Sequence, residues 1–124
     1  MSKRIVVCDD HVSLLGIIKY LLSKRGFIVQ TATNGEDALA LMRAASPDML
    51  ILDLAMPDLD GIGVLKQMST MTGKKPYVLV LSGQESGRLR EEALSLGARE
   101  LWKKPFNSAE LMAHVESLVA DGVF

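Results

Sequence analysis

Three acidic residues and one lysine stand directly after apolar runs, where they could bind a cation and a phosphoryl group. Asp9 and Asp10 follow one run, and Asp53 follows a second. Lys104 follows a weaker third run, and Ser82 comes after a fourth. If these runs are parallel strands of one sheet, the side chains meet at its carboxyl edge, where such sheets bind ligands.

The chemistry of such a cluster follows from its charges. Neighbouring carboxylates repel one another, which raises some of their pKa values and destabilises the fold. Mg²⁺ relieves this repulsion, because it takes oxygen ligands from one or two carboxylates and keeps waters and a phosphate oxygen. A carboxylate beside the ion and a lysine can attack phosphorus and form an acyl phosphate. The pattern therefore predicts phosphoryl transfer to Asp53.

Each of these features also has a plainer interpretation. Two aspartates after a strand commonly form a turn or a helix N-cap, and Asp53 alone could be a loop carboxylate. Ser82-Gly83 and Lys104-Pro105 are common signals of a turn and of a strand exit. Their joint occurrence, in order and at successive predicted strand ends, favours the functional interpretation.

The rest of the chain predicts elements that would position these residues. Short runs typical of strands cover residues 4–8, 27–31, 49–52, 77–81 and 100–103, and apolar residues with helical spacing follow each run. This alternation predicts an α/β fold, a doubly wound five-stranded parallel sheet with helices on both faces. The second and fifth strands contain polar residues and should lie at the edges.

The predicted helices have recognisable ends and faces. Gly26, Pro47 and Gly97 should end the first, second and fourth helices, and a capping box over residues 107–110 should open the fifth. In the fourth helix we expect one face to point inward and the other to be solvated. The alternative for the solvated face is a protein interface. These faces consist of Leu89, Ala93, Leu94 and Leu96, and of Arg88, Arg90, Glu91 and Glu92, respectively. We expect His114 to be a surface residue.

Length and composition set further limits. The 124 residues suit one domain, residues 1–124, and the hydrophobic fraction of 48% supplies a packed core. A net charge of -1 favours neither direct nucleic-acid binding nor an anionic membrane. Cys8, the one cysteine, should be a buried thiol in a reducing compartment. No apolar stretch approaches the roughly 20 residues of a transmembrane helix, so we expect a cytoplasmic protein.

The chain resembles the receiver domain of two-component response regulators, and in particular the chemotaxis regulators. The resemblance covers almost the whole chain, and the run from Pro47 to Gly61, with an aspartate, Met-Pro and then Asp-Gly, is its most specific part. It implies a flavodoxin-like (βα)5 fold with strand order 2-1-3-4-5.

The resemblance also implies a role for each site residue. Asp53 would be the phosphoacceptor, Lys104 would pair with the phosphoryl oxygens, and Ser82 would hydrogen-bond the phosphoryl group. Mg²⁺ would be bound by Asp10 directly, by Asp9 through water, by Asp53, and by the backbone carbonyl of Ala55. The Lys104-Pro105 peptide bond should be cis, as in the family.

Two positions depart from the family pattern. The family usually has Tyr or Phe three residues before the lysine, where this chain has Leu101. Trp102 cannot take that place, because successive strand residues face opposite sides of the sheet. Ala55 is smaller than the family's usual residue and would leave the path of an attacking water more open. Gln84 could orient that water.

The resemblance implies a signalling switch rather than an enzyme that turns over a small molecule. A histidine kinase or phosphotransfer protein would supply the phosphoryl group. Phosphorylation would then change the face formed by the fourth predicted helix, the strand over residues 100–103 and the fifth helix that opens at residues 107–110, through which a homodimer could form. The alternatives are an aspartyl-phosphate hydrolase, a flavin or nucleotide module, and a receiver-like scaffold that no longer uses phosphate. Ala55, where hydrolases have a second carboxylate, argues against the first, and Asp9-Asp10 would repel the phosphate of the second.

Overall fold

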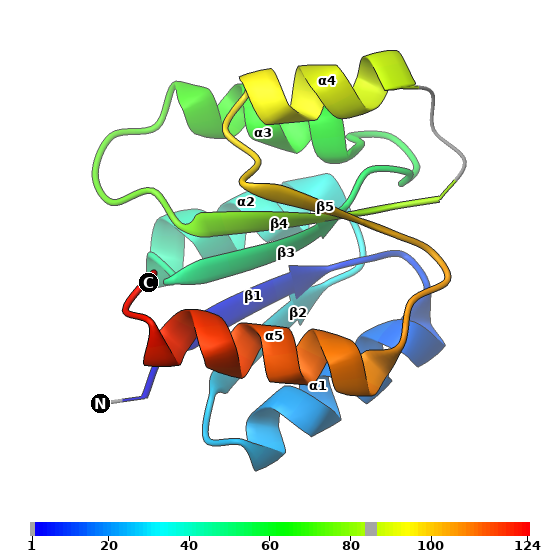
Figure 1. Ribbon diagram of the computed structural model, residues 1–124. Coiled ribbons are helices and arrows are strands. Elements are labelled where there is room, and N and C mark those ends of the chain that lie inside the picture. Colours follow the sequence, from blue (N-terminus) through cyan, green and yellow to red (C-terminus); the bar gives the residue numbers. More distant parts are fainter. Residues whose placement is uncertain (1, 84–86) are drawn as a thin grey trace.

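A five-stranded parallel sheet forms the centre of the computed structural model, which describes residues 2–83 and 87–124 (Figure 1). The strand order is β2-β1-β3-β4-β5, which confirms the predicted doubly wound topology and places β2 and β5 at the edges. The strands are β1 (Arg4–Cys8), β2 (Ile28–Ala32), β3 (Met49–Asp53), β4 (Tyr77–Ser82) and β5 (Glu100–Lys103). Relative to the prediction, β2 lies one residue later, and β3 and β4 each continue one residue further. Gln84 lies outside the described residues.

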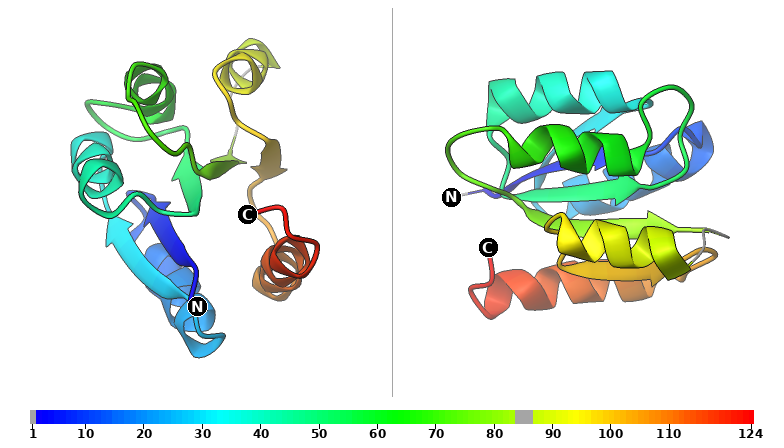
Figure 2. Two further views of the ribbon diagram at one scale, coloured as in Figure 1. Left: turned by 90° about the vertical axis from the view of Figure 1, so that its left-hand side faces the viewer. Right: turned by 90° about the horizontal axis from the view of Figure 1, so that it is seen from above.

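Five helices cover the two faces of the sheet, α1 and α5 on one and α2, α3 and α4 on the other (Figure 2). They are α1 (Val12–Lys24), α2 (Gly35–Ala45), α3 (Gly61–Ser69), α4 (Gly87–Ser95) and α5 (Ser108–Ala120). Side chains of Asn34, Asp60 and Asn107 accept the backbone N–H groups that open α2, α3 and α5. Gly26 adopts a φ of 90° directly after Arg25, the C-cap of α1, as expected for a helix stop.

Strand alternation divides the core into two apolar clusters. In β1, Val6 and Cys8 face α2 and α3, while Ile5 and Val7 face α1 and α5. The central strands β3 and β4 are apolar on both sides because both faces are covered by helices. Burial first, and the neighbouring aspartates next, raise the pKa of the Cys8 thiol to about 12, so it stays protonated.

The exposed side of α4 differs from the prediction. Leu89 and Leu94 are 37% and 48% exposed, whereas Ala93 is buried and Leu96 is partly buried. The helix is so oriented that Arg90, one turn before Ala93, is partly buried instead of solvated. Apolar spacing alone did not reveal this orientation, because leucines occur on two sides of this short helix.

His114 is likewise not a simple surface residue. Its Nε2 lies 2.7 Å from Glu100 Oε2, and its ring centroid lies 5.3 Å from that of Trp102. Glu100 also accepts hydrogen bonds from the Trp102 indole at 3.0 Å and from the Tyr77 hydroxyl at 2.5 Å. These hydrogen bonds around Glu100 join β4, β5 and α5. Burial and the hydrogen bond to Glu100 raise the pKa of Tyr77 to about 12.

Candidate functional site

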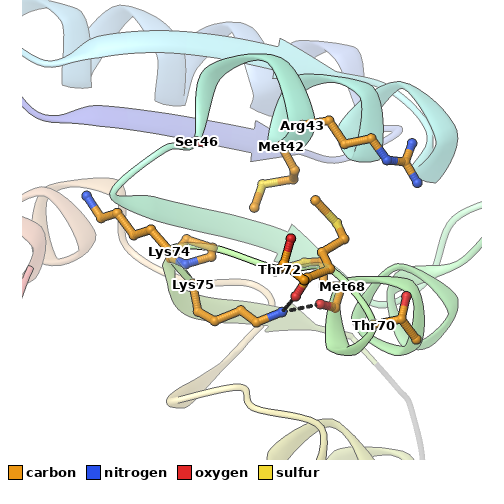
Figure 3. Close-up of a pocket in the computed structure, with 10 residues that line it drawn as sticks. Met42, Arg43, Ser46, Met68, Thr70, Thr72, Lys74 and Lys75 are labelled. Carbon is orange, nitrogen blue, oxygen red and sulfur yellow. Dashed lines mark hydrogen bonds between the residues drawn. The ribbon is translucent and has the colours of Figure 1, made fainter.

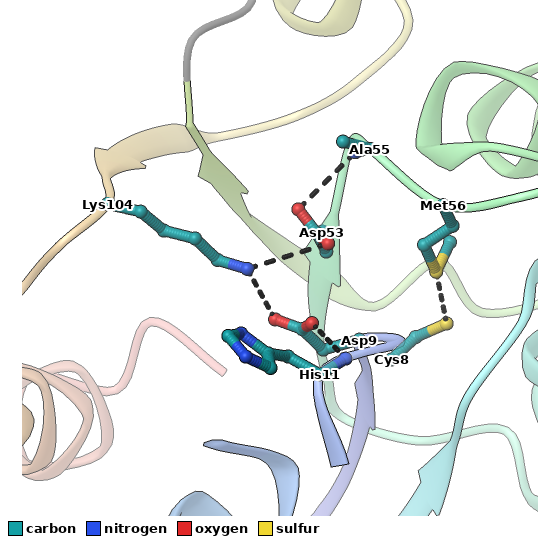
Figure 4. Close-up of polar contacts among 7 residues, drawn as sticks. All are labelled: Cys8, Asp9, His11, Asp53, Ala55, Met56 and Lys104. Carbon is teal, nitrogen blue, oxygen red and sulfur yellow. Dashed lines mark hydrogen bonds and ion pairs between the residues drawn. The ribbon is translucent and has the colours of Figure 1, made fainter. Parts of the chain in front are cut away.

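The predicted site residues Asp9, Asp10, Asp53 and Lys104 come together at the carboxyl edge of the sheet. Asp9 follows β1, Asp53 is the last residue of β3, and Lys104 follows β5. Parallel pairing of β1 with β3 and of β3 with β4 aligns the ends of these strands. Figure 4 shows the Lys104 side chain reaching across to both buried carboxylates.

Asp9 holds the lysine most closely. Its carboxylate is fully buried, and Oδ2 lies 2.8 Å from Lys104 Nζ. The other oxygen, Oδ1, accepts the backbone N–H of His11 at 2.9 Å. Burial alone would lower the pKa of Lys104, but the hydrogen bond to Asp9 and the charge of Asp53 outweigh it and raise that pKa. Lys104 therefore remains a cation in this site.

Asp53 lies farther from the lysine than Asp9 does. Its Oδ2 lies 3.5 Å from Lys104 Nζ, and its Oδ1 accepts the N–H of Ala55 at 3.3 Å. Burial, and then repulsion from Asp9, raise the pKa of Asp53 to about 6, although Lys104 acts in the opposite direction. One lysine thus leaves the cluster with an excess of negative charge.

The three carboxylates fit a hard divalent cation. One oxygen from each of Asp9, Asp10 and Asp53 lies within 4.8 Å of the others, and Asp10 is exposed to solvent at the mouth of the site. Carboxylate oxygens with room for water are the ligands that Mg²⁺ takes in proteins. Ala55 is exposed beside them and its amide faces Asp53. The carbonyl of Ala55 as a ligand stays a prediction.

The loop after Asp53 requires its glycine. A Cβ at Gly61 would lie 2.5 Å from the backbone oxygen of Asp53 and 2.7 Å from Cα of Leu54. Asp58 adopts a φ of 62°, and the Asp60 carboxylate accepts the N–H of Gly63 at 2.8 Å to begin α3. The Met-Pro and Asp-Gly parts of the motif therefore build a tight turn that carries the chain from Asp53 into α3.

Ser82 lies at the end of β4, and its contacts lead away from Asp53. Its side chain is buried, and Oγ accepts a hydrogen bond from Arg90 Nε of α4 at 3.1 Å. The backbone N–H of Lys104 donates to the Ser82 carbonyl at 2.7 Å. Sequence reasoning missed the role of Arg90. Its position three residues before Ala93, on the same helix face, was the available signal.

The cis Lys104-Pro105 bond and the positions of Leu101 and Trp102 agree with the expectations. Leu101 packs against the cluster of α2, α3 and α4, whereas Trp102 packs against that of α1 and α5. The two side chains thus serve opposite faces of the sheet, and Trp102 does not replace an aromatic residue at position 101.

A hollow of about 380 Å³ lies at the amino ends of the strands, opposite the candidate site (Figure 3). Methionines and three basic residues line it, but the lysines already have partners. Lys75 Nζ donates to the carbonyl of Met68 in the last turn of α3 and to that of Met71 just after the helix, and Lys74 pairs with Asp48. This hollow contains none of the predicted site residues.

Comparison with known proteins identifies the class to which this fold and site belong. The sequence model of one protein family, the response regulator receiver domain, matches residues 5–116. The chain therefore belongs to the receiver domain family of two-component response regulators. None of the helices in the described residues has the length and apolar character needed to cross a bilayer.

Individual relatives agree with this assignment. The alkaline phosphatase synthesis transcriptional regulatory protein PhoP of Bacillus subtilis is 35% identical over 119 residues, which are 96% of this chain and 49% of PhoP. The receiver domain of a response regulator from Bermanella marisrubri is 33% identical, with a TM-score of 0.85 over 96% of this chain and 99% of that structure. Chemotaxis protein CheY4 of Vibrio cholerae is 27% identical, with a TM-score of 0.85 over 94% of this chain and 98% of that structure. The chain spans about half the length of the curated relatives it matches.

Proposed function

We propose that this chain is a phosphoacceptor switch of the cytoplasm, in which Asp53 receives a phosphoryl group from a phosphohistidine of a kinase or phosphotransfer protein. An oxygen of Asp53 attacks phosphorus, the phosphorus–nitrogen bond breaks, and its electron pair stays on the histidine nitrogen. One observation carries the proposal. Asp53 is the last residue of the central strand β3, and its carboxylate lies beside Lys104 and two further aspartates.

The residues of the site divide this task. Asp9 holds Lys104 at 2.8 Å, and from there the ammonium reaches the oxygen of Asp53 at 3.5 Å. Lys104 would neutralise the charge that collects on the phosphoryl oxygens, because such transfers depend on positioning and electrostatics. Ser82 would donate its hydroxyl hydrogen bond to the phosphoryl group. Asp9, Asp10, Asp53 and the Ala55 carbonyl would hold Mg²⁺, which supplies the remaining positive charge when bound.

The surface of α1 supports docking of the phosphoryl donor next to this site. Val12, Ile17 and Tyr20 are exposed apolar side chains on the helix that directly follows Asp9 and Asp10. Neighbouring exposed apolar side chains are typical of protein interfaces, and Ile17 and Tyr20, three residues apart, lie on one side of this helix. A partner bound along α1 could reach the carboxyl edge of the sheet with its own histidine.

The face formed by α4, β5 and α5 would pass the signal on. Leu94 is exposed on α4, on the side of the helix away from Glu92, which pairs with Lys66 of α3, so this face offers an apolar contact to a second copy of the chain or to an output domain. PhoP, of which this chain matches about half, is named a transcriptional regulatory protein. An output that binds DNA therefore fits a longer form of this protein, with the receiver domain regulating it by protein contact.

Intact mass measurement tests the proposed function. With Mg²⁺ and a small acyl phosphate, the wild-type chain should gain the mass of one phosphoryl group, and Asp53→Asn should gain none. Asp58→Asn is the matched control, since it removes an exposed carboxylate from the next loop and should still be phosphorylated. A mass gain in Asp53→Asn, or none in the wild type, would refute the assignment and would favour a scaffold that does not use phosphate.

A further inference from the structure

Arg90 of α4 makes two hydrogen bonds to the end of β4. Its Nε donates to Ser82 Oγ at 3.1 Å, and its terminal guanidinium nitrogen donates to the Gly83 carbonyl at 3.4 Å. Ser82 is 1% exposed, so water does not compete for its hydroxyl. Hydrogen bonds that involve a charged donor are stronger than those between neutral groups. Arg90 therefore fixes both the side chain of Ser82 and the backbone that follows it.

Ser82 lies on the side of the sheet that α4 covers. Val78 and Val80 belong to the core cluster of α2, α3 and α4, and Ser82 continues their alternation along β4. Asp53 instead continues the alternation of Met49 and Ile51, which face α1 and α5. In the described residues no hydrogen bond joins Ser82 to Asp53. The hydroxyl of Ser82 is thus directed toward α4 rather than toward the acceptor.

The attachment of α4 to the molecule makes this contact important. Ala93 is the buried residue of α4. An ion pair of 3.4 Å between Lys66 and Glu92 links α4 to α3, but it is solvent-exposed and contributes little stability. The two hydrogen bonds from Arg90 are therefore among the contacts that attach α4 to the end of β4.

We propose that Arg90 is a positioning residue that holds Ser82 toward α4 before phosphorylation and releases it when Asp53 carries a phosphoryl group. The inference rests on the proposed function, in which Ser82 hydrogen-bonds that group. To reach it, the hydroxyl must turn from the side of the sheet that α4 covers toward Asp53, which breaks the hydrogen bond that it accepts from Arg90, and then donate its proton to a phosphoryl oxygen. The guanidinium then loses its partner, and α4 becomes free to shift together with its exposed leucines. Phosphorylation is thereby coupled to the face proposed to bind partners.

The first test replaces Arg90 by methionine, which keeps the apolar part of the side chain and removes the donors. Freed from Arg90, Ser82 should turn toward Asp53 more readily. Phosphorylation of Asp53 by a small acyl phosphate should then become faster by at least about 3-fold, the lower end expected for an ordinary hydrogen bond. Arg88→Met is the matched control, because Arg88 is exposed on the same helix and its loss changes the net charge equally. Its rate should equal that of the wild type.

A double-mutant cycle tests whether Arg90 acts through Ser82. In a Ser82→Ala background, Arg90→Met should change the phosphorylation rate by less than about 2-fold, since the shared contact is already absent. Amide hydrogen exchange provides a readout that needs no phosphate. Exchange over residues 87–95 should be about 3- to 10-fold faster in Arg90→Met than in Arg88→Met.

The outcomes separate this proposal from the function on which it rests. If the wild type is phosphorylated on Asp53 but Arg90→Met is unchanged or slower, the release of Ser82 is refuted and the proposed function stands. An equal acceleration in Arg88→Met or in the Ser82→Ala background would also refute it, as would equal exchange over α4. If the wild type takes up no phosphoryl group, the proposed function fails and the coupling fails with it.

Discussion

The charges of individual residues explain both the chemistry of the site and its cost in stability. Asp9 and Asp53 are buried together, and Lys104 lies closer to Asp9 than to Asp53. Burial, and then repulsion from Asp9, raise the pKa of Asp53 to about 6, and the charge of Lys104 offsets this only in part. A carboxylate whose charge is incompletely compensated favours binding of a cation and, under the proposed function, acceptance of a phosphoryl group. The same charge destabilises the folded chain when neither is present.

Asp53→Asn should stabilise the metal-free protein at neutral pH. In the wild type the folded state holds the Asp53 proton more tightly than the unfolded state, so its stability falls as pH rises from about 4 to 6. The variant lacks this loss. At pH 7.5 in a chelator its free energy of unfolding should exceed that of the wild type by on the order of 2 kcal/mol, and the gain should vanish below about pH 4.

Urea unfolding of both proteins across this pH range measures the effect. Asp58→Asn removes an exposed carboxylate nearby and serves as the control, with an expected change within about 0.5 kcal/mol. If Asp53→Asn is no more stable than the wild type at pH 7.5, the carboxylate cluster is better compensated than its geometry indicates.

At the scale of elements, the strands fix the positions of the site residues and side-chain contacts fix the helices around them. Strand β5 lies at the edge of the sheet, and its Glu100 accepts hydrogen bonds from Tyr77 of β4 and Trp102 of β5 and contacts His114 of α5. Burial would raise the pKa of Glu100, but these hydrogen bonds outweigh it and lower that pKa. The carboxylate therefore fastens α5 to the edge of the sheet.

Glu100→Gln should weaken this attachment in a pH-dependent way. Because the folded pKa lies below the unfolded value of 4.5, the contribution of the carboxylate is complete above pH 4.5 and is lost as pH falls through the lower folded value. At pH 7 the variant should lose on the order of 1–2 kcal/mol of unfolding free energy. The difference from the wild type should shrink below pH 4.5.

Fluorescence of Trp102, the only tryptophan, reports this unfolding directly. Glu91→Gln on the exposed side of α4 provides the control for loss of one negative charge. A difference between Glu100→Gln and the wild type that stays constant from pH 7 to pH 3 would show that packing, and not the charge of Glu100, is responsible.

At the scale of the whole molecule, phosphorylation at one edge of the sheet would be detected on the outer face of α4. Ser82 bonds to Lys104 through its backbone and to Arg90 through its side chain, so it connects the site, β5 and α4. The exposed Leu89 and Leu94 then lie on the helix most directly affected. This arrangement can couple a change of charge at Asp53 to the association of two molecules.

Phosphorylation should therefore promote self-association through Leu94. Analytical ultracentrifugation of the phosphorylated wild type should detect dimers, and Leu94→Asp should weaken dimerisation by at least about 10-fold, because it places a charge in an apolar contact. Phosphorylation itself should be unaffected. Ile17→Asp on α1, which is similarly exposed, should leave dimerisation unchanged. Equal weakening by both variants, or by neither, would contradict an interface on this face.

Much of this protein could be predicted from local sequence patterns. Apolar runs and helical spacing indicated the ten elements to within a residue or two at the strand ends, since such periodicity reflects which face is buried. Parallel strands bring their carboxyl ends to one edge, so Asp9, Asp53 and Lys104 could be grouped in advance. The polar residues of β2 and β5 likewise predicted the two edge strands.

The tertiary structure decided which of these side chains touch. Three contacts depend on the rotation of each helix and the register of each strand. Lys104 lies closer to Asp9 than to Asp53, Arg90 reaches Ser82, and His114 contacts Glu100. A rotation of α4 about its own axis by a few tens of degrees exchanges a buried position for an exposed one. Because leucines lie on two sides of that helix, the sequence did not show which side is buried. Sequence periodicity determined what the elements are, whereas packing between distant segments determined how the site is connected to the surface.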